Sequence, residues 1–440
     1  MIGGTTLALV IFLALLGAMA LRVPVALAML LCGSLGYIAV VGVSPYLAYI
    51  KTTPYFLFSN YTLSVIPLFI LMGAIAENAG LSKALFTLVN AVIGHRRGGI
   101  AMATIGASTF FGAVCGSSVA TTATMCRAAL PELRRYGYSP RLASGTIAVG
   151  GTLGILIPPS VILVIYAIST EQNIAHLFMA ALIPGVLASL FYMITIGVLV
   201  RRDPMAGPAG PRCSRAERRQ AMKESWPVFL IAVIVIGGIY GQVFTPTEGA
   251  AVGVSVTLLV SILRRSLSWQ GLRTALLQTA ETTAMIFLIL LGAEVFNAFL
   301  ALSHMPDTAA AAITGMGLSP YAVLGVLLLF YIALGAVMDE LAMILLTLPV
   351  FFPLVMALDF GLPSADLAIW FGILVLIVVG IGLTAPPIGL NVFVVSAIAK
   401  DIPMKETYRG VIPFLIADIV RLALVVAFPG LALGLVHWLN

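Results

Sequence analysis

Charged residues are scarce in this chain of 440 residues: they make up 9% of the sequence, whereas apolar residues make up 61%. A soluble domain carries about 25% charged residues, so this chain has too few to cover a folded surface in water. Its apolar residues lie in long runs, as is typical of a multi-pass α-helical membrane protein. The composition therefore excludes a soluble enzyme, a disordered protein and a nucleic-acid-binding protein.

Residues that carry catalysis or hold metals are also few. The four cysteines show no C-x-x-C spacing, and three of them lie in apolar segments. The four histidines fall near expected helix ends, where none could activate a serine of Gly116-Ser117-Ser118 as a nucleophile. The sequence contains no His-Glu-x-x-His and no P-loop. We therefore expect no enzyme, no disulfide framework and no metal cage.

The first apolar run covers residues 7–20 and is followed, not preceded, by its nearest basic residue, Arg22. A secretory signal peptide has the opposite charge order. The sequence therefore predicts an uncleaved first helix whose N-terminus lies outside the cytoplasm.

The most polar segment, residues 201–226, lies almost at the midpoint and is rich in Lys, Arg, Pro and Gly. This composition predicts a cytoplasmic linker. The flanking halves resemble each other: residues 70–81 and 289–300 share seven identities in twelve positions. The pair Pro158-Pro159 similarly corresponds to Pro386-Pro387. We interpret residues 1–200 and 227–440 as two repeats.

Charge predicts the orientation of each repeat. Basic residues flank the apolar segment 98–130 on both sides, which places both flanks in the cytoplasm. Each full crossing needs about 20 residues, so a segment of this length, broken by glycines and serines, forms two arms too short to span the bilayer. It is predicted to be a re-entrant hairpin entering from the cytoplasm. The equivalent segment 320–353 lies in a stretch without Lys or Arg, residues 274–399, and is predicted to enter from outside. The repeats are therefore expected to be inverted.

An inverted repeat requires an odd number of crossings in each half, and five are expected. Both termini then lie outside. The aromatic-rich segment 45–61 is typical of an interfacial helix, with a docking face for a partner as the alternative. The expected crossings are 5–21, 23–43, 61–79, 141–170 and 176–200, then 228–244, 246–263, 278–302, 366–399 and 410–437.

Four interruptions of apolar helix carry the candidate chemistry. Irregular backbone at membrane depth occurs where protein or a water-filled cavity satisfies it. Helix-end carbonyls can then coordinate a cation, and free N–H groups at half-helix N-termini attract an anion. We therefore predict a secondary-transporter site near the membrane midplane, with 141–170 and 366–399 as discontinuous helices. The interruptions are Gly112–Ser118, Gly150–Pro159, Gly335–Asp339 and Gly380–Asn391.

Polar side chains near these breaks suit a substrate or a cation. Ser117 and Ser118 can cap the second arm of the first hairpin or contact substrate, and Thr121 follows on the same arm. Asn391 offers an amide donor and acceptor without a charge, and Thr384 could lend an oxygen to a cation.

Several acidic residues have a structural explanation. Glu248 belongs to the capping box Thr245-Pro246-Thr247-Glu248, and Asp418 can pair with Arg421 on one helix. Asp339 is expected to cap the second arm of its hairpin, with cation coordination as the alternative. Glu77, Glu281 and Glu294 remain open. The absence of a carboxylate pair favours a sodium site of carbonyls and hydroxyls over a proton relay.

Four motifs together resemble the large membrane subunit of tripartite ATP-independent periplasmic (TRAP) transporters over nearly the whole chain. They are Phe111–Ser118, Gly154–Ser160, Phe244–Ala250 and Thr384–Asn391. The resemblance implies an elevator-type fold of the ion-transporter superfamily in the bacterial inner membrane. It also implies sodium-coupled import of organic anions such as dicarboxylates or sialic acid. The implied partners are a small four-helix membrane subunit and a periplasmic binding protein.

The same resemblance implies two or more bound sodium ions and no organic cofactor. The family usually has serine where this chain has Cys115, which weakens the first site if a hydroxyl ligand is required. For substrate, the candidates are Ser118, Thr121 and Asn391. One sodium would lie among Cys115, Ser117, Gly154, Ile157 and Pro159, and a second would use Met338 or Asp339 with Thr384 and Pro386.

Two other functions remain open at this point. A divalent-anion/sodium symporter of the same superfamily would work alone, and dependence on a binding protein distinguishes it. A channel or a membrane scaffold would show no saturable, ion-coupled uptake.

Overall fold

Residues 4–315 and 317–439 are described by the computed structural model, and their regular structure is helical, with no strand. The first half contains α1 (Gly4–Ala20), α2 (Val25–Val41), α3 (Val43–Phe58), a 3₁₀ turn (Tyr61–Ser64), α4 (Val65–Asn78), α5 (Leu81–Ile93), α6 (Gly99–Cys115), α7 (Ser118–Arg135), α8 (Pro140–Leu156), α9 (Val161–Ser169) and α10 (Ile174–Arg202). The second half contains α11 (Arg215–Tyr240), α12 (Pro246–Leu263), α13 (Trp269–Leu302), α14 (Met305–Gly315), α15 (Pro320–Gly335), α16 (Glu340–Met356), α17 (Ser364–Gly382), α18 (Leu390–Ile398), α19 (Met404–Ala427) and α20 (Gly430–Leu439).

Helix length and hydropathy identify the membrane-crossing segments. Within the described residues, seven helical segments are long and apolar enough to cross a membrane, and the bent pair α8 and α9 is an eighth. Helices α1 and α2 have 17 residues each, the lower end of the roughly 17–25 residues that span a bilayer. These ten segments correspond to the ten expected crossings. The chain is an all-α, multi-pass membrane protein.

Two helical hairpins, α6–α7 and α15–α16, occupy the positions expected for re-entrant segments. Gly116 ends α6 with a left-handed φ of +65°, and Ser117 then caps α7. In the second hairpin, Asp339 caps α16 and accepts hydrogen bonds from the backbone of Leu341 and Ala342 at 3.0 Å each. The first hairpin is longer than expected, because α7 continues through Arg135 rather than ending near residue 130.

Each hairpin is followed by a discontinuous helix. The break between α8 and α9 contains Pro158 and Pro159 and bends the pair by 44°. The break between α17 and α18 contains Pro386 and Pro387. Proline lacks the N–H that would continue the helical hydrogen bonds, which explains why both helices stop at these pairs. Both halves therefore contain a hairpin followed by a broken helix, as expected for two repeats.

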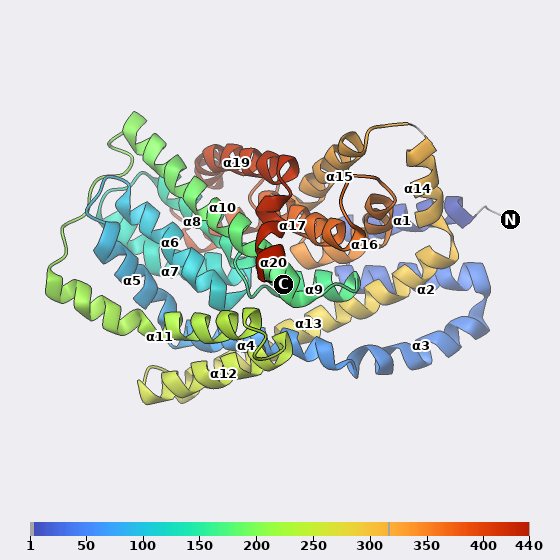
Figure 1. Cartoon of the computed structure of the whole chain (residues 1–440), viewed down its shortest axis with the longest axis horizontal. Helices are drawn as coiled ribbons and strands as arrows, with labels where there is room; N and C mark the ends of the chain where they lie inside the picture. The colour runs from blue at the N-terminus through green and yellow to red at the C-terminus, as the bar shows by residue number, and fades with distance from the viewer. Residues whose placement is uncertain (1–3, 316, 440) are drawn as a thin grey trace.

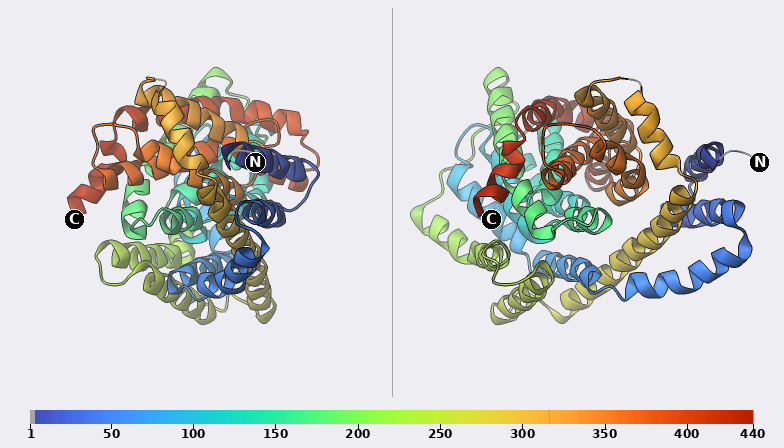
Figure 2. Two further views of the ribbon diagram at one scale, coloured as in Figure 1. Left: turned by 90° about the vertical axis from the view of Figure 1, so that its right-hand side faces the viewer. Right: turned by 45° about the vertical axis from the view of Figure 1, so that its right-hand side comes forward.

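The helices form two groups (Figures 1 and 2). Helices α6–α10 lie together with α15–α20, and the two hairpins approach the middle of this group from opposite ends of the long axis (Figure 1). Helices α2–α4 and α11–α13 form a second layer along one side. In this layer α2 packs along α13, and α4 packs along α12. We call the first group the hairpin group and the second the lateral layer.

Helix α3 lies at the outer edge of the lateral layer, where it contacts α2 and α13 (Figure 2). Of its residues, Thr53 alone is buried. Its Phe58 stacks on Phe287 of α13, with ring centroids 5.7 Å apart. An exposed, aromatic-rich helix at this place agrees with both alternatives for segment 45–61, an interfacial helix or a docking face.

The segment expected to be a linker, 201–226, is only partly irregular. Helix α10 continues through Arg202, and α11 begins at Arg215. The Ser214 side chain and Glu217 form a capping box that starts α11. The connection is held in place, because Gly207 accepts a hydrogen bond from the Gly98 amide at 2.8 Å, and Ala206 accepts one from the Ser139 amide at 3.0 Å.

Two further elements differ from expectation. Segment 410–437 was expected to be one helix, but it is divided into α19 and α20 before Gly430, because Pro429 cannot continue the hydrogen bonds of α19. Helix α5 was not expected as a separate element. It packs against α6 and α11.

Candidate functional site

The two halves of the chain meet at Ser118 and Asn391. The Asn391 amide nitrogen donates to the Ser118 hydroxyl at 2.8 Å and to the Ala148 carbonyl at 3.1 Å. Ser118 is the first residue of α7, and Asn391 lies in the first turn of α18. Both side chains are fully buried. The hydrogen bonds therefore join the N-termini of two half-helices, one from each repeat, in the interior.

The first hairpin tip packs directly on the first break. A side chain at Gly116 would meet the Pro159 carbonyl, and one at Gly154 would meet the Ser117 carbonyl. Only glycine permits these approaches of backbone to backbone. Thr121 donates its hydroxyl to the Ser117 carbonyl at 2.7 Å. The predicted residues Ser117, Gly154 and Pro159 are therefore brought together at one place.

The first break leaves carbonyl oxygens without their usual partners. The residues four positions after Gly154 and Ile155 are Pro158 and Pro159, which have no N–H to donate. Carbonyl oxygens are hard ligands of the kind that alkali cations prefer. Ile157 follows as the C-cap of α8, and Cys115 ends α6 with its backbone against Gly73 of α4. This donor set fits a sodium ion held chiefly by backbone oxygens.

The second hairpin tip packs on the second break in the same manner. The Ala336 carbonyl accepts hydrogen bonds from the amides of Ile388 and Gly389 at 3.2 and 3.3 Å. Thr384 is fully buried, and its hydroxyl donates to the Ile381 carbonyl at 3.1 Å. The oxygen of Thr384 keeps acceptor capacity for a cation. Met338 lies at the tip beside Asp339.

Asp339 acts as a helix cap, as the sequence predicted. Its Oδ1 atom accepts both amide hydrogen bonds of the first turn of α16. A carboxylate has about four acceptor positions, so the two capping hydrogen bonds leave Asp339 with further acceptor capacity. Within the described residues, no three His, Cys, Asp or Glu side chains lie together as a metal cluster.

The two breaks differ in exposure. Residues 151–160 are all buried, whereas Pro386, Pro387 and Ile388 are exposed. The Tyr408 hydroxyl donates to the carbonyls of Pro387 and Ile388, at 2.8 and 2.6 Å. In this conformation the first break is therefore closed and the second reaches the protein surface.

Glu340 was missed by the sequence analysis. It is the first residue of α16, its exposed fraction is 9%, and its Oε2 atom has no hydrogen-bond partner. An acidic residue beside a helix cap resembles an ordinary first-turn residue, so its burial could not be predicted. The available signal was its place at the end of an apolar run in a stretch without Lys or Arg.

A buried polar network extends from the first broken helix. Thr152 of α8 lies 3.2 Å from the Tyr192 hydroxyl, which donates to Asp418 at 2.8 Å. Asp418 pairs with Arg421 at 2.8 Å, and both side chains are almost fully buried. The pairing of Asp418 with Arg421 confirms the prediction. Its connection to α8 through Tyr192 required the tertiary structure.

Two of the remaining acids are explained by local contacts. The capping box of Glu248 with Thr245 is present as predicted. Glu77 of α4 accepts hydrogen bonds from Thr124 and Arg127 of α7. Glu77 therefore ties the lateral layer to the first hairpin.

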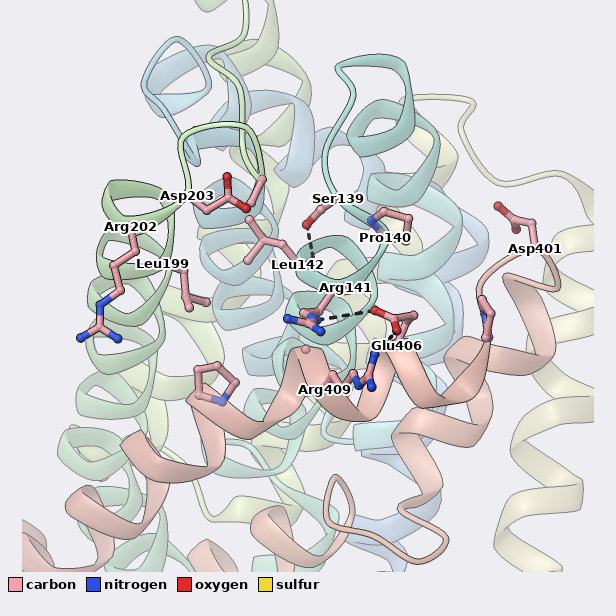
Figure 3. Close-up of a pocket in the computed structure, with 14 residues that line it drawn as sticks. Ser139, Pro140, Arg141, Leu142, Leu199, Arg202, Asp203, Asp401, Glu406 and Arg409 are labelled. Atoms are coloured by element: carbon pink, nitrogen blue, oxygen red, sulfur yellow. Dashed lines mark hydrogen bonds and ion pairs between the residues drawn. The ribbon is translucent and has the colours of Figure 1, made fainter.

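One well-formed cavity lies away from the hairpin tips. It has a volume of about 550 Å³ and is formed by the start of α8, the end of α10 and the start of α19. In Figure 3, Arg141, Glu406 and Arg409 converge in it; Glu406 lies 3.6 Å from Arg141 and 2.9 Å from Arg409. Since the 17 residues of α8 make it about 25 Å long, the cavity lies roughly that far from the break. We therefore place the candidate site at the hairpin tips.

Comparison with known proteins agrees with this geometry. A family model described as "Tripartite ATP-independent periplasmic transporter, DctM component" matches residues 10–431. A C4-dicarboxylate TRAP transporter large permease protein of Pseudomonas aeruginosa is 36% identical over 382 residues, covering 87% of each chain. A sialic acid TRAP transporter large permease protein of Vibrio cholerae is 32% identical over 372 residues, covering 84% of this chain and 85% of that protein.

A solved structure shows the same fold. The YdaH transporter of Alcanivorax borkumensis aligns with a TM-score of 0.62 at 16% identity, covering 89% of this chain and 90% of its own. At this identity the likeness concerns the fold alone.

Proposed function

We propose a function from the premise that this chain belongs to the DctM component family of tripartite ATP-independent periplasmic transporters. The chain is the large permease of such a transporter. We propose that it imports organic anions, such as dicarboxylates, sialic acid or related carboxylates, with sodium ions as the coupling ions. The observation that carries the proposal is the meeting of two half-helix N-termini at Ser118 and Asn391.

The proposed substrate class follows from the electrostatics of that meeting point. A helix N-terminus carries a partial positive charge and unpaired N–H groups, which favour an anion. Ser118, Thr121 and Asn391 add neutral hydrogen-bonding groups that fix its orientation. The relatives named above carry the names of carboxylate substrates, a C4-dicarboxylate and a sialic acid.

Sodium coupling is proposed on the chemistry of the breaks. At the first break, Ser117, Gly154, Ile157 and Pro159 offer backbone oxygens, with Cys115 completing the set through its carbonyl. At the second, the oxygens of Met338, Asp339, Thr384 and Pro386 form a second candidate set. A cation bound at a tip would draw the hairpin onto its broken helix, which orders the first turns that face the anion.

The proposed assembly lies in the bacterial inner membrane with both termini in the periplasm. Its partners are a small four-helix membrane subunit, a periplasmic binding protein that delivers the substrate, and the surrounding lipids. We propose that the hairpin group moves as an elevator against the lateral layer. Contacts between the two, such as that of Glu77 with Arg127, would then change during the cycle.

Reconstitution tests this proposal. Proteoliposomes containing the chain, its small subunit and its binding protein should accumulate a labelled carboxylate when an inward sodium gradient is applied. Replacing sodium by potassium should abolish uptake, and removing the binding protein should do the same. Full uptake without the binding protein would favour a symporter that works alone. Uptake driven equally well by a proton gradient without sodium would contradict sodium coupling.

A further inference from the structure

The carboxyl group of Glu340 is enclosed without a counter-charge. All residues from Glu340 to Leu348 are buried, so the first turn of α16 lies entirely inside the protein. The Oε2 atom of Glu340 accepts no hydrogen bond, and no ion pair involves this residue within the described chain. Its neighbour Asp339 is a second carboxyl, already engaged in capping the helix.

The described helices around α16 contain no buried basic residue that could neutralise the carboxyl group of Glu340. Helices α9, α13, α14, α15 and α17 pack against α16. Residues 274–399 contain no Lys or Arg. The sole base on these five helices is Arg273, near the start of α13, and it is exposed. Asp366 of α17 already pairs with His437, at 3.0 Å.

The N-terminus of α16 offsets only part of this negative charge. A helix N-terminus is equivalent to about half an elementary charge, whereas Asp339 and Glu340 together carry two carboxyls. A buried carboxylate without a partner is among the costliest groups in a protein interior. Its hard oxygen atoms are at the same time good ligands for small cations. The negative charge at the tip of the α15–α16 hairpin is therefore not fully balanced by the protein, and a bound cation could balance it.

We propose that Glu340 is a carboxylate ligand of a sodium ion bound at the tip of the α15–α16 hairpin. Glu340 is additional to the set of Met338, Asp339, Thr384 and Pro386, and it supplies the charge that those mostly neutral oxygens lack. The inference rests on the proposed sodium coupling and goes beyond it by naming a residue that the family resemblance does not assign.

Sodium binding to the purified chain tests this role without measuring transport. The thermal unfolding temperature in detergent should rise with sodium concentration when ionic strength is held with potassium, because a ligand that binds only the folded state stabilises it. Binding of labelled sodium provides a second readout. Glu340→Gln should raise the half-saturating sodium concentration at least tenfold, and labelled sodium should be lost from one site.

Glu281→Gln is the matched control, since it makes the same change at an exposed carboxyl of α13. It should leave both readouts unchanged.

Glu340→Asp shortens the side chain by one methylene group and keeps the carboxylate. It should therefore raise the half-saturating sodium concentration by less than Glu340→Gln does, and it replaces the Gln variant if that variant does not fold. If Glu340→Gln binds sodium as tightly as the unaltered chain, the proposal for Glu340 is overturned and the proposed coupling is not. If Glu340→Gln does not fold, the same comparison is made with Glu340→Asp. Absence of sodium binding in the unaltered chain would overturn the proposed coupling and this inference together.

Discussion

Ser118 and Asn391 are 273 positions apart in the sequence and yet exchange two hydrogen bonds, at 2.8 and 3.1 Å, in the buried centre of the hairpin group. Because the two hydrogen bonds are reciprocal, neither side chain can move away without breaking this contact between the repeats. A substrate bound at this place, as we propose, would compete with the two side chains for the same donors and acceptors. Their hydrogen bonds are therefore a direct target for mutation.

The first prediction concerns Ser118. Ser118→Ala removes one hydroxyl from the proposed anion site, and we expect the KM for substrate to rise about tenfold, corresponding to roughly 1.4 kcal/mol. The sodium half-saturation should not change. Ser108→Ala is the control, because Ser108 is buried in the same hairpin but its hydroxyl has no partner. An equal KM in the two variants would place the substrate elsewhere.

The second prediction concerns the first proline pair. Pro158→Ala restores an N–H four residues after Gly154 and allows the helix to close over its carbonyl. We expect the half-saturating sodium concentration for uptake to rise by about an order of magnitude for each 1.4 kcal/mol of coordination lost. Ser160→Ala, next to the pair but outside the carbonyl set, should have a much smaller effect. A sodium titration that does not distinguish the two variants would rule out coordination at this break.

The third prediction concerns topology. In a Cys213→Ser background, Arg135→Cys should react with an impermeant thiol reagent from the cytoplasm, and Asp359→Cys from the periplasm. Both positions are exposed, and the other three cysteines are buried. The expectation follows from the basic residues around the first hairpin and their absence around the second. Labelling of position 135 from the periplasm would refute the orientation.

The fourth prediction concerns the stability of the buried pair. Asp418→Asn leaves the Arg421 charge without compensation, and we expect a loss of about 3–5 kcal/mol in the free energy of unfolding. Replacing both residues with leucine should recover a large part of that loss. Glu406→Gln removes a more exposed partner at the surface and should cost only about 0–1 kcal/mol. Thermal unfolding of the three variants in detergent compares them, and a double variant no more stable than Asp418→Asn would contradict this account.

The features that the sequence predicted well are those with a local physical cause. Paired prolines remove two successive N–H donors, so the helix breaks at 158–159 and 386–387 could be placed without tertiary information. The capping roles of Asp339 and Glu248 depend on residues within one turn, and the same holds for the pair Asp418 and Arg421.

The features that were missed depend on distant segments or on overlooked signals. The burial of Glu340 results from five helices packed around α16, and the link from Tyr192 to Asp418 joins residues 226 positions apart. The link between Tyr192 and Asp418 has no signature in a single stretch of sequence, and Glu340 has only its place at the end of an apolar run without Lys or Arg. The start of α11 does have a local sequence signature, the capping box of Ser214 and Glu217. It was overlooked because the segment is rich in basic residues.

The connection between α10 and α11 also determines where the polypeptide can be opened. Its first part is fastened at Ala206 and Gly207, and Gly210 donates to the Gly94 carbonyl at 2.9 Å. Beyond it, Pro211 and Arg212 are exposed. A protease site or an epitope tag is therefore best inserted between Pro211 and Arg212. There it would leave the fastened segment intact and allow the two halves to be separated after folding, so that their association can be measured directly.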